Sequence, residues 1–261
     1  MRLLVTGGVG ILGSEVVRRA VGGEWDVTAT WHEREPRVEG QWVRLDVTDP
    51  AAVGRAAADV DAVIHTAYRQ RQPQGWAVNV HGAENVARAA RGIRLVYLSS
   101  DVIFDGRRGH YREEDEPAPV HAYGASKAEA ERRVAAAHPE ATIVRTSLLY
   151  GGPEPGPQER LAAGGGTFFV DEIRSPVQVT DLADALLELL ALAWAGPLHL
   201  GGADDVSRYE LALLLGADPA RIRPGRTTPD RCPDVSLDSS RAAALLRTRL
   251  RGVREVTQSE R

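Results

Sequence analysis

Short apolar runs alternate along the chain with longer segments in which apolar residues recur every three or four positions. The runs predict seven strands, at residues 2–6, 26–31, 41–47, 61–67, 93–100, 141–150 and 197–202. The longer segments predict helices that begin near Ile11, Pro50, Trp76, Ala122 and Thr180. Strands that are apolar on both faces and alternate with helices form parallel sheets with helices on both sides. The pattern therefore predicts an α/β fold, a Rossmann-type doubly wound parallel sheet.

Two segments interrupt the alternation. Residues 151–175 are rich in Gly and Pro, and they predict a loop with at most one short helix and one short strand. Residues 203–261 predict a helix that follows a capping box formed by Ser207 and Glu210. They also predict a final helix within residues 239–249. Both segments lie outside the predicted sheet, so they are candidates for an accessory lobe.

The two interruptions suggest that one part of the chain binds a dinucleotide and another part binds the substrate. We expect a dinucleotide-binding domain of residues 1–150, to which residues 176–202 return. We expect a small, discontinuous substrate-binding lobe built from residues 151–175 and 203–261. In open parallel sheets the ligand lies at the carboxyl ends of the strands, which is where such a lobe would close over it.

Composition narrows the class of protein. The 261 residues are 43% hydrophobic and carry a formal net charge of −4 without a basic stripe, so we expect no nucleic acid partner. The longest apolar stretch, residues 182–196, contains Asp184 and Glu188 and is too short to cross a membrane. The start of the chain has no signal-peptide pattern. With one cysteine, Cys232, there is no internal disulfide and no cysteine-built metal cluster. We expect a cytoplasmic protein without a metal, and the frequent Ala and Arg suggest a bacterial source.

A glycine pattern stands at the first predicted strand-to-helix turn. In VTGGVGILG, Gly7, Gly10 and Gly13 follow the strand, and Ile11 and Leu12 open the helix. This setting lets a pyrophosphate approach the backbone at a helix N-terminus. The alternative is that the glycines only make a tight turn.

The end of the second predicted strand bears on the choice of nucleotide. The acidic residue that usually binds an adenosine ribose is missing there, and Trp31 stands in its place. His32 and Arg34 could meet a 2′-phosphate, which favours NADPH over NADH. The alternative is that Arg34 is a solvated loop charge.

Tyr123 and Lys127 form the second chemical pattern. Four residues apart on a helix, they share one face, one turn apart. A tyrosine can take part in acid–base chemistry near neutral pH only if a cation favours its phenolate, because its ordinary pKa is about 10. The preceding strand ends in Ser99, Ser100 and Asp101, which places a hydroxyl at the carboxyl edge of the sheet. Taken alone, a Tyr–Lys pair at this spacing is common on amphipathic helices.

Together these patterns resemble the extended short-chain dehydrogenase/reductase superfamily, in particular its dTDP-4-dehydrorhamnose reductase-like, sugar nucleotide-binding branch. The matching stretches are VTGGVGILG, LDVTD, Asn79, YLSSDVIFDG, YGASK, RTSLLYG and SPVQVTDLA. They extend over nearly the whole chain. The resemblance implies that Ser100 polarises a carbonyl, that Tyr123 donates a proton, and that Lys127 lowers the tyrosine pKa and contacts the nicotinamide ribose.

The resemblance also implies a set of binding residues. Gly7, Gly10 and Gly13, with Ile11 and Leu12, would line the pyrophosphate; Asp46 and Val47 the adenine; Thr66 and Ala67 the ribose and phosphates; Asn79 belongs to the cofactor-binding set. Asp101, with Ser100, is a candidate substrate contact, or else a cap bonded to nearby backbone. Arg145 and Asp181 are expected to be structural, Cys232 to be inert, and His65 to pack against the cofactor or core.

Two departures concern the substrate. Val102 stands where the branch often has Tyr, and residues 151–167 are short for a segment that helps to enclose the nucleotide. The expected activity is NAD(P)H-dependent reduction of a keto group on a sugar nucleotide or a related small compound. Two alternatives stay open: an epimerase or dehydratase that retains NAD, and a non-catalytic, dinucleotide-binding regulatory subunit. A homodimer is compatible with all three.

Overall fold

A computed structural model describes residues 1–36, 40–70, 75–228 and 231–259. The chain divides into two compact units. The first comprises Met1–Ser99, Ala125–Val144 and Ala183–Pro197, and the second Ser100–Gly124, Arg145–Leu182 and Leu198–Arg261. These units are defined by chain contacts, whereas the expected division at residue 150 concerns which part binds which ligand and stays a prediction.

A seven-stranded sheet organises the fold and confirms the predicted class. Its strands are β1 (Arg2–Thr6), β2 (Asp26–Trp31), β3 (Gln41–Arg44), β4 (Ala62–His65), β5 (Arg94–Leu98), β6 (Thr142–Thr146) and β11 (Gly196–Leu200). Their order is β11-β6-β5-β4-β1-β2-β3, and the pairings from β3 through β6 are parallel. The strand order reverses next to β1, which is the arrangement that places a ligand beside the first strand-to-helix turn.

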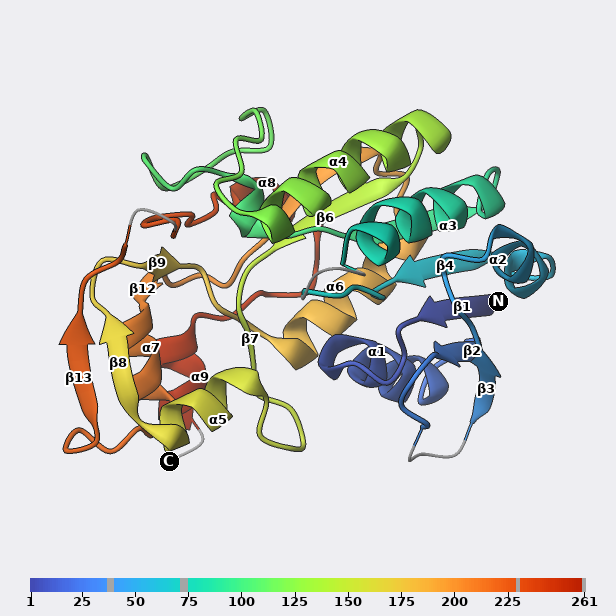
Figure 1. The fold of residues 1–261 in the computed structure, drawn as a ribbon. Helices are drawn as coiled ribbons and strands as arrows, with labels where there is room; N and C mark the ends of the chain where they lie inside the picture. Colours follow the sequence, from blue (N-terminus) through green and yellow to red (C-terminus); the bar gives the residue numbers. More distant parts are fainter. Residues whose placement is uncertain (37–39, 71–74, 229–230, 260–261) are drawn as a thin grey trace. The chain divides into compact units, whose positions relative to one another are not determined.

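Helices cover both faces of this sheet in the first unit (Figure 1). The helices are α1 (Ile11–Val21), α2 (Pro50–Ala57), η1 (Ala77–Gly82, a π-helix), α3 (Ala83–Ala89), α4 (Ala122–Ala137) and α6 (Val179–Ala191). Apolar residues of α2, α3 and α4 form one core with Leu4, Val63 and Tyr97 of the sheet. On the opposite face, Arg19 of α1 pairs with Asp184 of α6. Asp49 caps α2 by accepting hydrogen bonds from the N–H groups of Ala51 and Ala52.

The second unit is built from short elements. They are η2 (Asp101–Ile103), β7 (Leu149–Tyr150), α5 (Pro157–Gly164), β8 (Gly166–Phe169), β9 (Ile173–Arg174), β10 (Val177–Gln178), β12 (Val206–Ser207), α7 (Arg208–Leu214), β13 (Ile222–Gly225), α8 (Ser240–Leu245) and α9 (Val253–Ser259). Three two-stranded sheets pair β7 with β10, β8 with β13, and β9 with β12. Residues 151–175 hold one short helix, as their composition predicts, but two short strands, β8 and β9, where at most one was expected.

Two further local predictions for this unit need correction. Ser207 does cap α7, but the carboxylate of Glu210 binds Arg254 rather than closing a reciprocal capping box. The final helix predicted within residues 239–249 ends at Leu245, and a further helix follows. Leu246, which follows α8, has extended backbone angles, and between α8 and α9 the backbone N–H and guanidinium of Arg251 both donate to the carboxylate of Asp181.

Candidate active site

The glycine turn of the first unit lies against the end of β4. Gly7 has a φ of +72°, and a Cβ added there would lie 2.7 Å from the Cα of Ala67. A Cβ at Gly13 would lie 2.3 Å from the carbonyl oxygen of Gly7. Gly10, the N-cap of α1, offers no side chain to the first N–H groups of the helix. A closely approachable backbone at an uncapped helix N-terminus fits a dinucleotide pyrophosphate. Ile11 and Leu12 begin that helix, with Leu12 buried in the core.

The end of β4 borders this turn as expected. The Thr66 hydroxyl donates to the carbonyl of Thr6 at 2.7 Å, which fixes Thr66 beside the glycines. His65 is buried, shares a 2.5 Å hydrogen bond with the Thr6 hydroxyl and stacks on Tyr97. Burial, assisted by the charge of Lys127, lowers the pKa of His65 to about 3, so its ring is neutral. His65 thus packs in the core, one of the two environments expected for it.

Residues after β2 reach the same turn. The guanidinium of Arg34 donates to the carbonyl of Val9, within the glycine sequence. His32 lies 4.0 Å from the carboxylate of Asp46, whose other oxygen accepts from the Thr48 N–H at 2.9 Å. A cation thus lies at the glycine turn, on the side of β2, where a 2′-phosphate would be expected.

Two further members of the expected cofactor set have structural partners. Val47 is buried, and a Cβ on Gly82 would lie 2.6 Å from its side chain. The amide of Asn79 accepts from the Arg69 N–H at 2.8 Å, and it donates to the Arg69 carbonyl and to the Ser126 hydroxyl, both at 2.9 Å. Asn79 therefore ties the segment after β4 to α4, and a cofactor contact would compete with one of these bonds.

Lys127 is almost completely enclosed in the first unit. Only 4% of the residue is exposed, and its ammonium donates to the Leu98 carbonyl at 2.6 Å. The ammonium lies 5.0 Å from the ring centre of Tyr97 and 5.6 Å from that of Tyr68, where the ring faces attract a cation. Burial lowers the pKa of Lys127 to about 7, although the charge of Glu131 acts in the opposite direction.

The sequence carries a signal for this residue that motif reasoning missed. Of the 32 Lys and Arg residues in the chain, Lys127 is the only lysine. Arginine cannot be deprotonated in a protein, whereas a buried lysine readily changes its pKa. A chain that uses arginine at every other cationic position therefore marks position 127 as one where that difference matters.

In the second unit, the start of α4 lies directly against the segment that follows β5. A Cβ added to Gly124 would lie 2.2 Å from the carbonyl oxygen of Val102. The fold thus brings Tyr123, in the first turn of α4, to the segment that carries Ser100 and Asp101. The Tyr123 ring stacks on His121, with 6.4 Å between the ring centres. Two stretches that lie over twenty residues apart in the sequence are therefore neighbours, as the catalytic hypothesis requires.

Asp101 is surrounded by protein groups. It is 3% exposed; one carboxylate oxygen accepts from the Ser100 hydroxyl at 3.1 Å, and the other accepts from the Ser147 hydroxyl at 2.6 Å. Arg174 lies 3.8 Å from the second oxygen. Burial raises the pKa of Asp101, while Arg174, the two hydroxyls and the Val102 N–H act against that rise.

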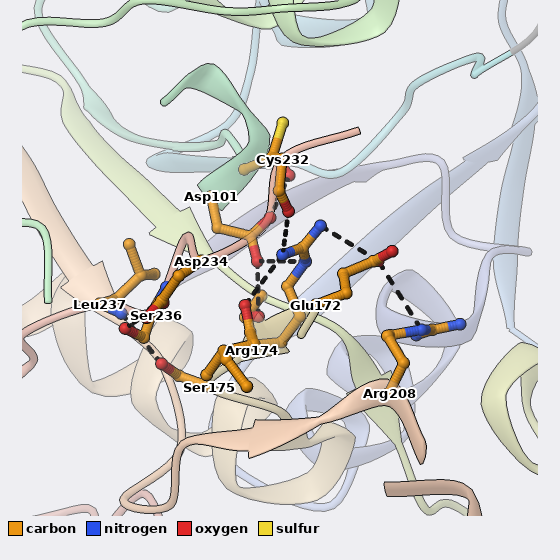
Figure 2. Close-up of polar contacts among 12 residues, drawn as sticks. Asp101, Glu172, Arg174, Ser175, Arg208, Cys232, Asp234, Ser236 and Leu237 are labelled. Carbon is orange, nitrogen blue, oxygen red and sulfur yellow. Dashed lines mark hydrogen bonds and ion pairs between the residues drawn. The ribbon is translucent and has the colours of Figure 1, made fainter. Parts of the chain in front are cut away.

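Arg174 belongs to a buried charged cluster that sequence reasoning did not find (Figure 2). Its guanidinium donates to the carbonyls of Ile173 and Cys232 and to the carboxylate of Glu172. Glu172 also accepts from Arg231 at 2.6 Å, and Arg208 lies 3.9 Å from it. No sequence period marks this cluster, because its members come from separate short helices, a short strand and loops.

Three residues expected to be structural or inert have matching surroundings. Arg145 is buried and donates to the carbonyl of Glu113, and Asp181 binds Arg251. Cys232 is buried, and burial raises the pKa of its thiol.

Among the described residues, no group of three or more His, Cys, Asp or Glu side chains could hold a metal ion. No helix in that part of the chain is long and apolar enough to cross a membrane.

The parallel sheet, the glycine turn at β1 and the Tyr-x-x-x-Lys sequence of α4 are the features of an extended short-chain dehydrogenase/reductase fold. Within that class, the chain belongs to the family described as the RmlD substrate binding domain, whose model matches residues 1–251. The resemblance expected from the motifs is thereby confirmed.

Individual relatives agree with this assignment. The chain is 37% identical over 248 residues to a dTDP-4-dehydrorhamnose reductase of Mycobacterium tuberculosis, which covers 85% of this chain and 78% of the relative. It is 31% identical to the methionine adenosyltransferase 2 subunit beta of Xenopus tropicalis, with 82% and 71% covered. A dTDP-4-dehydrorhamnose reductase of Bacillus anthracis, solved in complex with NADP, superposes with a TM-score of 0.83 at 25% identity, and covers 99% of this chain and 97% of that one.

Proposed function

We propose that the chain is an NADPH-dependent reductase that transfers a hydride to a keto group of a nucleotide-linked sugar. The observation that carries the proposal is the start of α4, where Gly124, the residue after Tyr123, lies against the carbonyl of Val102, two residues after Ser100. Lys127, the only lysine, follows Tyr123 one turn later in the sequence of the same helix. The family and the named reductases among its relatives support the same reaction. The nicotinamide nucleotide supplies the hydride when bound.

The residues of the chain would then divide the remaining work. Ser100 donates a hydrogen bond to the keto oxygen, which stabilises the negative charge that develops there. Tyr123 transfers its phenolic proton to that oxygen. The charge of Lys127 favours the resulting phenolate. Each step requires only a side chain placed at the reacting oxygen, so the protein contributes position and local electrostatics.

Positively charged side chains support the choice of cofactor and of substrate class. Arg34, which already contacts the glycine turn, would bind a 2′-phosphate and so favour NADPH; NADH is the weaker alternative. In the second unit, Arg174, Arg208 and Arg231 surround two carboxylates, those of Asp101 and Glu172. This excess of positive charge suits an anionic substrate such as a nucleoside diphosphate sugar.

The finer expectations about setting belong to the same proposal. We infer a bacterial cytoplasmic enzyme, in keeping with the composition and with the bacterial reductases among the relatives. We infer a homodimer as its assembly, which light scattering of the purified protein would test. Neither nucleic acid nor membrane is proposed as a partner.

One alternative has its own support. The methionine adenosyltransferase subunits among the relatives are named as subunits of another enzyme, so a non-catalytic regulatory role remains the second candidate. An enzyme that retains NAD, such as an epimerase or dehydratase, would be recognised by nucleotide that stays bound during purification.

The test is turnover with a matched variant. Purified protein is mixed with NADPH and a panel of dTDP-4-keto-6-deoxysugars, and oxidation of NADPH is followed by its absorbance. Y123F, which removes only the phenolic oxygen, should abolish turnover, while calorimetric titration shows NADPH binding within a small factor of wild type. Wild-type rates in Y123F would remove Tyr123 from the mechanism. NADPH binding without turnover on any keto sugar would instead favour the regulatory role.

A further inference from the structure

The environment of Asp101 in the second unit suggests a function other than substrate contact. Both of its carboxylate oxygens face protein hydroxyls, one from Ser100 and one from Ser147, and 3% of the residue is exposed. A carboxylate so enclosed has little surface to offer a ligand. Its nearest functional neighbour is the hydroxyl of the residue that precedes it.

The carboxylate is held in place from the far side. Arg174, itself 5% exposed, lies 3.8 Å from the oxygen that also accepts from Ser147. The guanidinium cannot easily shift, because it also donates to the carbonyls of Ile173 and Cys232, at 2.8 and 3.0 Å. Figure 2 shows this arrangement, with Asp101 and Cys232 on adjacent sides of the Arg174 side chain. Asp101 is therefore a fixed point in the second unit.

A serine hydroxyl needs such a fixed point. Its side chain has three staggered rotamers, and an unrestrained hydroxyl divides its time among them. The bond from Ser100 to Asp101 selects one rotamer. That bond uses the only hydrogen of the Ser100 hydroxyl. For Ser100 to donate to a keto oxygen, this hydrogen turns away from Asp101 while the Ser100 oxygen stays where it is.

We propose that Asp101 is a positioning residue, which holds the Ser100 hydroxyl in the rotamer that meets the keto oxygen, and that Ser147 and Arg174 hold Asp101 for this purpose. This inference rests on the proposed reductase function for its kinetic consequences. It replaces the direct substrate contact expected from the sequence with an effect transmitted through Ser100. Its structural consequence, the rotamer of Ser100, can be measured without turnover.

A double-mutant cycle separates this role from a direct one. D101N should lower kcat about tenfold to a hundredfold with KM nearly unchanged, which is less than the loss expected on removing the hydroxyl itself. In an S100A background, D101N should change kcat by less than about threefold, because the group through which it acts is gone. D105N is the matched control: that carboxylate accepts from the Tyr111 hydroxyl, and its replacement should leave kcat within about twofold. An equal loss from D101N with and without Ser100, or no loss at all, overturns the proposal.

A crystallographic measurement of the Ser100 rotamer tests the proposal without turnover. High-resolution structures of wild type and D101N should show one Ser100 rotamer in the first and a changed or mixed rotamer in the second. If D101N does not fold, S147A replaces it, because S147A removes one neutral donor to Asp101 and leaves the buried charges paired. An unchanged Ser100 rotamer in the variant overturns the proposal. Absence of turnover in wild type refutes the reductase function but leaves this structural test valid.

Discussion

The titration of Lys127 offers a direct measurement of the physics of the proposed site. Because Lys127 is the only lysine, protein made with isotope-labelled lysine should give a single side-chain amine signal in the NMR spectrum. Burial lowers the pKa of Lys127 from 10.5 to about 7. The cofactor-free protein should therefore show that signal titrating near neutral pH, rather than above pH 10.

The same shift has a calculable effect on stability. The difference between 10.5 and about 7 corresponds to about 5 kcal/mol by which protonated Lys127 destabilises the folded state. This cost is fully present below about pH 7, where the folded and unfolded states both bind the proton. As the pH rises toward 10.5 only the unfolded state keeps the proton, so the free energy of unfolding increases and the cost disappears.

K127M provides the reference for this measurement. Urea unfolding of cofactor-free wild type and K127M, compared at each pH, cancels the other titrating groups. From about pH 7 to about pH 9, wild type should gain about 2 kcal/mol relative to K127M. Loss of the bond to the Leu98 carbonyl adds a constant offset, but it does not change the slope. A pH-independent difference, or an NMR pKa close to 10, would show that the enclosure described here does not desolvate the amine.

Other contacts lead to predictions of the same kind. R34A should weaken NADPH binding about tenfold to a hundredfold and leave NADH binding unchanged, as measured by calorimetry; equal losses for both nucleotides would exclude a 2′-phosphate role. G124A should lower the free energy of unfolding by about 2 kcal/mol or more, since its methyl group would overlap the Val102 carbonyl, and a wild-type urea midpoint would contradict that close approach. D181N should cost about 2–4 kcal/mol in the same assay because Arg251 loses its charged partner, and R251A should account for most of that loss in a double-mutant cycle.

The sheet could be predicted because its signal is local. The strands β1, β4, β5 and β6 read as apolar runs and are almost wholly buried, so the pattern and the environment agree, whereas the edge strand β3 is largely exposed. The glycine turn was equally readable, since Gly7 and Gly13 stand where only a bare backbone fits. The sequence pattern thus predicts the structure wherever the residues of one strand or turn themselves determine what is buried.

The second unit shows where this reasoning ends. Its elements are two to eight residues long, too short for a hydrophobic period, and β9 pairs with a strand more than thirty residues later. The partners of Asp101 come from positions 147 and 174, so no spacing rule could find them. The link between α8 and α9 is equally hidden in the sequence, since Arg251 binds Asp181, seventy residues away.

The chemical difference between lysine and arginine explains why position 127 is a lysine in a chain whose other Lys and Arg positions are all arginine. At position 127 the cation must fit between the rings of Tyr68 and Tyr97 and donate to a single carbonyl. A guanidinium has five donors, so at this position most of its N–H groups would be buried without partners. It also could not lose its charge to reduce the cost of burial. An ammonium is compact, and when it is desolvated it can release its proton. A cation enclosed this tightly, with one carbonyl to accept from it, is therefore better supplied by lysine than by arginine, and the burial that lowers the pKa of Lys127 also strengthens its charge interactions at short range.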